Sequence, residues 1–237
     1  MDGARAAASR RHVTPRAAET LGERLGPAAT FATTEHFNLQ TARSITVSEA
    51  NGRASIYLAA LSSNLIALAF IGQMSRLGPA FHAFALILLP VLAFVGVVTF
   101  ERLVQSSLED IAFANRIGRL RDFYFTLAPE LEPYLVGVRD PAGAEAGDGD
   151  RLRPSGWQLT LTTAGMVAVV NSVVVGAGAG LLLETIGAGS LAIELMAGAV
   201  VGAAAMSLHR LRHRRALDAF AIQAIDLAAV FVPTRPR

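Results

Sequence analysis

The sequence predicts an all-α, polytopic membrane protein with four transmembrane helices in two hairpins and amphipathic cytoplasmic helices. The first observation is composition, because 52% of the 237 residues are hydrophobic and only 17% are charged. The second is distribution, because the apolar residues gather in four blocks of about the 20 residues that a helix needs to cross ~30 Å of hydrocarbon. A soluble protein would need four helices that are apolar on every face, which is rare outside membranes.

The apolar blocks are almost free of charge. They comprise residues 56–73, 81–100, 157–183 and 187–208. Glu194 is the only acidic or basic residue within them. Glycine and proline mark the short connections at 74–80 and 184–190, so each connection is predicted to be a tight turn that closes a hairpin.

The basic residues orient the chain. All 21 of them are arginine, and Arg76 is the only one in either short connection. Because basic residues are enriched on the cytoplasmic side of membrane proteins, both termini are predicted to be cytoplasmic. The arginine-only, alanine- and glycine-rich composition resembles that of high-GC bacteria, which indicates a bacterial plasma (inner) membrane. A net charge of +2 leaves no broad basic field, so no nucleic-acid partner is expected.

The polar segments divide the chain further. We expect a disordered or amphipathic cytoplasmic N-terminus over 1–45, a first hairpin with its cytoplasmic helix over 46–135, a flexible acidic linker over 136–156, a second hairpin with its helix over 157–232, and a tail over 233–237. Because amphipathic helices must bury their apolar stripes, this plan predicts a homo-oligomer or a cytoplasmic protein partner.

The helix expected after the second span carries a heptad-like stripe through Val104, Leu108, Ile111 and Asn115. An asparagine on such a seam can fix the register of an oligomer. Alternatively, Asn115 faces water or another helix of the same chain. The shortness of the stripe favours this second interpretation.

Three polar residues inside the spans are candidates for a pore or ion path: Asn64, Asn171 and Glu194. A carboxylate in hydrocarbon usually faces a bundle interior or an aqueous cavity. However, Glu194 is close to the outer boundary, and the span could begin after it. The two asparagines could line water or form hydrogen bonds between helices, and packing is the commoner reason for such residues.

Small residues in the last two spans predict close helix packing. Ala168, Ser172, Gly176 and Gly180 follow one another at a spacing of four, and Gly198 and Gly202 repeat that spacing in the fourth span. Such patterns let helix backbones approach closely, within one chain or between subunits.

The segment after the fourth span is basic, with Arg210, Arg212, Arg214 and Arg215. These arginines are candidates for binding lipid headgroups, although anchoring of the topology alone also explains them. His209 and His213 have a spacing that can hold a metal, but the neighbouring arginines would repel a cation. We therefore predict no metal site.

No catalytic residues are predicted. The sequence has no lysine for a phosphate-binding loop, no nucleophile elbow and no paired metal-binding histidines with a glutamate between them. We expect neither an enzyme nor a cofactor. The leading hypothesis is an oligomeric ion channel or pore-forming protein that contacts membrane lipids; the alternative is a non-conducting scaffold that binds partners through its cytoplasmic helices.

Two stretches carry a resemblance to a known group. The chain resembles uncharacterised actinobacterial four-span membrane proteins in residues 49–57 with the span after them, and in residues 119–134. The pairing of two spans with a cytoplasmic helix is also loosely similar to SLATT-type proteins, which are proposed membrane effectors in bacterial conflict systems. The second span pair of this chain departs from that architecture.

Overall fold

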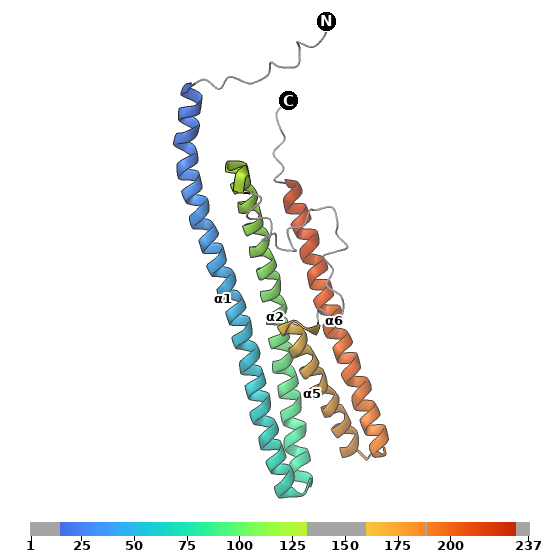
Figure 1. Cartoon of the computed structure of the whole chain (residues 1–237). Helices are drawn as coiled ribbons and strands as arrows, with labels where there is room; N and C mark the ends of the chain where they lie inside the picture. Colours follow the sequence, from blue (N-terminus) through green and yellow to red (C-terminus); the bar gives the residue numbers. More distant parts are fainter. Residues whose placement is uncertain (1–14, 132–159, 188, 231–237) are drawn as a thin grey trace.

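The computed structural model describes residues 15–131, 160–187 and 189–230 (Figure 1). Its elements are α1 (Pro15–Ser75), α2 (Pro79–Leu127), η1 (Pro129–Leu131), α5 (Thr163–Thr185) and α6 (Leu191–Val230). The described residues contain no strand, and four helices are long and apolar enough to cross a membrane. The predicted all-α class with four such helices is therefore confirmed. The expected linker 136–156 and tail 233–237 lie outside the described residues.

The helices differ greatly in length. α1 has 61 residues and α2 has 49, which at 1.5 Å per residue gives about 90 Å and about 75 Å. α5 has 23 residues, or about 35 Å, and is the only one of the four whose length matches a single membrane crossing. The other three helices extend well past its N-terminal end, toward the end of the bundle where α1 begins and α6 finishes (Figure 1).

Residues 15–45 belong to the same helix as the first span. α1 runs without interruption from Pro15, with Pro27 inside it. Ala32 and Leu39 are buried in this part of α1. Packing against α2 explains the helix, because a buried face stabilises a segment whose intrinsic propensity alone would not.

A tight turn joins α1 to α2. Arg76 and Leu77 adopt left-handed backbone conformations, with φ of 49° and 56°. The Leu77 N–H donates to the Gly72 carbonyl at 2.9 Å, which caps the end of α1. Pro79 then begins α2, where its fixed φ and missing N–H are tolerated.

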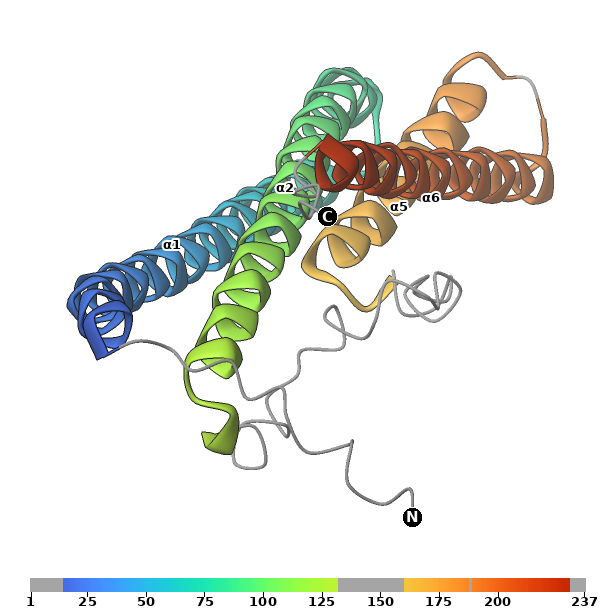
Figure 2. The same ribbon diagram turned by 90° about the horizontal axis from the view of Figure 1, so that it is seen from above.

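The four long helices are arranged in sequence and do not form a closed bundle. α1 packs along α2, α2 along α5, and α5 along α6, and no contact of comparable extent joins α1 to α6. Figure 2 shows α1 and α6 on opposite sides of the contact between α2 and α5. One flank of α1 and most of α6 are therefore uncovered.

Two apolar clusters hold the first helix pair to the second. The one nearer the turns is built on Leu61, Leu89, Leu92 and Val174. The other lies nearer the chain ends and contains Tyr57, Phe100, Leu103, Val104, Ala164 and Val167. Both clusters combine α1, α2 and α5, so α5 is the helix that joins the two pairs.

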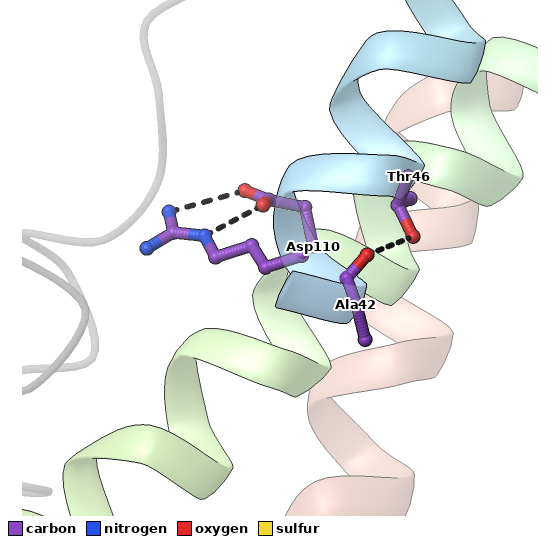
Figure 3. A network of polar contacts seen from close by, with 4 residues as sticks. Ala42, Thr46 and Asp110 are labelled. Carbon is purple, nitrogen blue, oxygen red and sulfur yellow. Dashed lines mark hydrogen bonds and ion pairs between the residues drawn. The ribbon is translucent and has the colours of Figure 1, made fainter. Parts of the chain in front are cut away.

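Beyond these clusters, α1 and α2 continue together as a two-helix stalk. Its α2 face agrees with the predicted stripe only in part: Val104 of the stripe is buried, but Leu108, Ile111 and Asn115 are half-buried. The other buried residues on this face lie outside the stripe, namely Leu103, Ala114 and Ile117. An ion pair also joins the two helices of the stalk, because Arg43 on α1 meets Asp110 on α2. The Arg43 Nε lies 2.7 Å from Asp110 Oδ1 (Figure 3).

Candidate functional site

A chain of three polar side chains crosses the interface between the two helix pairs. The Tyr57 hydroxyl on α1 donates to the Asn171 Oδ1 on α5 at 3.3 Å. The Asn171 Nδ2 lies 3.3 Å from the His209 Nε2 on α6. Asn171 is completely buried, and Tyr57 and His209 are also buried. We call these three residues the polar chain.

Gly96 on α2 makes room for the polar chain. A Cβ atom at this position would lie 2.1 Å from the Asn171 Oδ1 and 2.7 Å from the Tyr57 hydroxyl. Both distances are far below van der Waals contact. Glycine is therefore the one residue type that lets α2 approach the hydrogen bond between α1 and α5 this closely.

Phe100 covers the other end of the polar chain. Its ring stacks on the His209 ring with centroids 4.5 Å apart and meets the His213 ring edge-on at 6.3 Å. Both histidines are buried against α2 and α5, so their spacing of four serves packing. Their i, i+4 spacing suggested only a metal site, because their partners are more than 30 residues away along the chain and no local pattern marks them.

Charged and polar pairs lie just beyond this site. The Arg212 Nε donates to Glu101 Oε1 at 2.9 Å. The Arg210 guanidinium donates to the Thr160 hydroxyl at 3.3 Å. Two of the four candidate lipid-binding arginines therefore have partners within the chain, whereas Arg214 and Arg215 are exposed.

The three pore candidates are not brought together. Asn171 lies in closed packing within the polar chain, and Asn64 donates to the carbonyl of Ala60 in its own helix at 2.7 Å. Glu194 is half-buried in the first turn of α6. In the described part of the chain, none of the three side chains forms a hydrogen bond with another.

The candidate packing residues lie where α5 crosses α6. A Cβ at Gly176 would lie 2.5 Å from the Gly198 carbonyl oxygen, and one at Gly202 would lie 3.0 Å from the Ser172 carbonyl oxygen. Near the turn, a Cβ at Gly180 would lie 3.1 Å from the Glu194 carbonyl oxygen. The backbones of α5 and α6 thus touch within one chain.

A groove of about 690 Å³ runs beside this crossing. Its walls come from α5 and α6 and are mainly apolar, with Ser172 and Met206 toward one end. Glu184 and Glu194 line the opposite end, next to the turn between the helices. Glu184 also lies 3.4 Å from the His82 Nε2 on α2.

The stalk contains a second polar site, far from the apolar spans. The rings of His36 on α1 and Tyr124 on α2 lie 6.0 Å apart. Within the described part of the chain, neither His36 Nδ1 nor the Tyr124 hydroxyl has a hydrogen-bond partner. Burial first, and then the positive charge of Arg121, lower the pKa of His36 from its ordinary value.

Comparison with known proteins gives no relative: no family model, curated protein or solved structure matches the chain. The four apolar helices are compatible with an integral membrane protein. The function must therefore be argued from the geometry of these sites alone.

Proposed function

We propose that the chain is a subunit of a homo-oligomeric ion channel in a bacterial plasma membrane, with both termini in the cytoplasm. The observation that carries the proposal is the groove between α5 and α6, together with the uncovered surface of α6. Within the described residues, no residue in the most apolar stretch of α6 is fully buried, although its glycines contact α5. A second copy placed against this surface would close the groove into a conduit.

The carboxylates would make such a conduit selective for cations. Glu184 and Glu194 lie at the same end of the groove, and each copy in a symmetric ring would contribute both. Rings of acidic side chains favour cations over anions. We therefore propose a cation-selective path between subunits, with Glu194 at its mouth and the apolar walls below it acting as the gate.

The remaining candidates take structural roles in this proposal. Asn171 belongs to the polar chain that joins the helix pairs, and Asn64 bonds to its own helix. Arg214 and Arg215 are exposed after the fourth span, where the cytoplasmic leaflet presents anionic lipid headgroups. Their attraction to these lipids would hold α6 at a fixed depth.

The experiment is conductance of the purified full-length protein in planar bilayers, with the oligomer mass measured in parallel. We expect cation-selective currents, and Glu194→Gln reduces the permeability ratio of cations to anions. Glu109→Gln is the matched control, because Glu109 is an exposed carboxylate on the stalk. A monomer that carries no current at any voltage would overturn the proposal.

The second candidate is a non-conducting scaffold, and the stalk favours it. Residues 15–55 of α1 extend about 60 Å beyond the apolar stretch at 1.5 Å per residue. Phe31 and Phe37 on this part are 74% and 71% exposed. If the protein is a scaffold, it carries no current. The double variant Phe31→Ser, Phe37→Ser should then abolish a cross-link formed in cells between the stalk and a defined partner. The control Glu109→Gln should leave that cross-link intact.

A further inference from the structure

The hydrogen bonds of the polar chain have a fixed direction. An amide NH₂ group only donates, so His209 Nε2 must accept from Asn171 Nδ2. His209 is then neutral, with its proton on Nδ1. At the other end the Tyr57 hydroxyl donates to Asn171 Oδ1. Both hydrogen bonds of the polar chain thus run in the same direction, from a donor on α1 through α5 to an acceptor on α6.

We propose that His209 is a proton-binding site that controls the contact between the two helix pairs. A proton from solvent binds the lone pair of Nε2, which turns this nitrogen from an acceptor into a donor. The Asn171 NH₂ group then faces another donor, and their hydrogen bond is lost. The inference does not depend on whether the protein conducts ions.

Reversal of the Asn171 amide restores the bond to His209, because the Tyr57 hydroxyl can accept from the NH₂ group as well as donate. Reversal does not remove the charge that the proton brings. His209 is only 7% exposed, and the Glu101 carboxylate is already paired with Arg212. A buried cation without its own counter-ion is costly, so protonation favours separation of α1 and α2 from α5 and α6, which lets water reach the ring.

The charges around His209 come from two helices. α2 contributes Glu101, and α6 contributes Arg210 and Arg212, which are paired with Thr160 and Glu101. His213 lies across the Phe100 ring, and α1 contributes only the Tyr57 hydroxyl. The single charged residue of α5 is Glu184, at its opposite end. His209 and His213 are therefore the histidines of this site, and burial lowers the pKa of both from the ordinary value, with the Glu101 carboxylate opposing the shift at His209.

The first test measures the distance between the helix pairs. The chain has no cysteine, so Gln105→Cys on α2 and Leu211→Cys on α6 give one spin-labelled pair in the full-length protein in lipid nanodiscs. We expect the distance distribution to shift to longer values between about pH 8 and about pH 5, across the histidine range. His209→Gln, whose amide oxygen can accept from Asn171, abolishes the shift, whereas His213→Gln retains it.

The second test is ¹⁵N NMR of histidine-labelled wild-type protein, which needs no variant to fold. We expect His209 to carry its proton on Nδ1 at about pH 8 and to gain a second proton over the pH range in which the distance changes. A proton on Nε2 at high pH would overturn the proposal. So would a distance that is the same at both pH values, or a pH response that persists in His209→Gln.

Discussion

The two helix pairs pack by different means. α1 and α2 meet through side chains, such as Leu61 with Leu92 in the spans and Arg43 with Asp110 in the stalk. α5 and α6 meet through backbone atoms, because glycine brings the Gly176 and Gly198 main chains together. Side chains can change rotamer to absorb a substitution, whereas two touching backbones cannot. The second pair should therefore tolerate far less change at its interface.

The polar chain lies between these two extremes. It contributes a side-chain hydrogen bond from the first pair and requires a glycine for close approach, as the second pair does. One substitution in each interface should therefore lower the free energy of unfolding by an amount that depends on how easily the contacting atoms can move aside.

The largest effect is expected for Gly176→Ala. The new methyl group would lie 2.5 Å from the Gly198 carbonyl oxygen, so α5 and α6 must separate. We expect the free energy of unfolding in detergent micelles to fall by about 1–3 kcal/mol, the usual cost of overpacking. Gly178→Ala is the control, because its methyl group would make an ordinary contact with Leu89 at 3.7 Å. Equal losses in the two variants would contradict backbone contact at this crossing.

Gly96→Ala should cost less, at about 1–2 kcal/mol, because the atoms it meets are the ends of side chains. Asn171 and Tyr57 can turn aside, but their hydrogen bond is then broken. The same unfolding measurement applies, with Gly118→Ala on the same helix as control, since nothing lies within 4 Å of a Cβ there. The comparison fails if Gly118→Ala is as destabilising as Gly96→Ala.

Asp110→Asn tests the side-chain contact of the stalk. The Arg43 and Asp110 side chains are 31% and 28% exposed, so solvent screens the pair and we expect a loss of only about 0.5–1 kcal/mol. The neighbouring Glu109→Gln removes an exposed carboxylate at the same depth and should be neutral. Chemical unfolding of both variants gives the difference, and a loss of several kcal/mol in Asp110→Asn would show that the stalk depends on this pair.

The sequence predicts where the apolar spans lie but not which residues they contact in the other helices. Apolar blocks of membrane length predicted the four spans because that requirement is local. The polar chain joins Tyr57, Asn171 and His209, whose separations of 114 and 38 residues depend on how α5 sits between the pairs. For residues 15–45 the sequence left both a disordered and an amphipathic segment open, since these residues lack a strong pattern of their own and pack against α2.

The smallest effect is expected at His36, in the stalk. Its pKa lies below the ordinary value in the folded protein, so the unfolded segment binds a proton more readily. The stalk is therefore most stable above about pH 6.5, the ordinary histidine pKa. It loses stability as the pH falls through the lower pKa that His36 has in the folded protein. Hydrogen exchange of the α1 amides around His36 should therefore speed up on acidification.

Burial also lowers the pKa of His209 and His213, so the variant His36→Gln isolates the contribution of His36. Glutamine keeps a polar side chain at the position and removes the titration. We expect the acid-induced rise in exchange to disappear around residue 36 and to persist around His209, where the second proton site lies. If the pH dependence near residue 36 survived the substitution, the stalk would owe it to another group, and the burial of His36 against Tyr124 would be without energetic consequence.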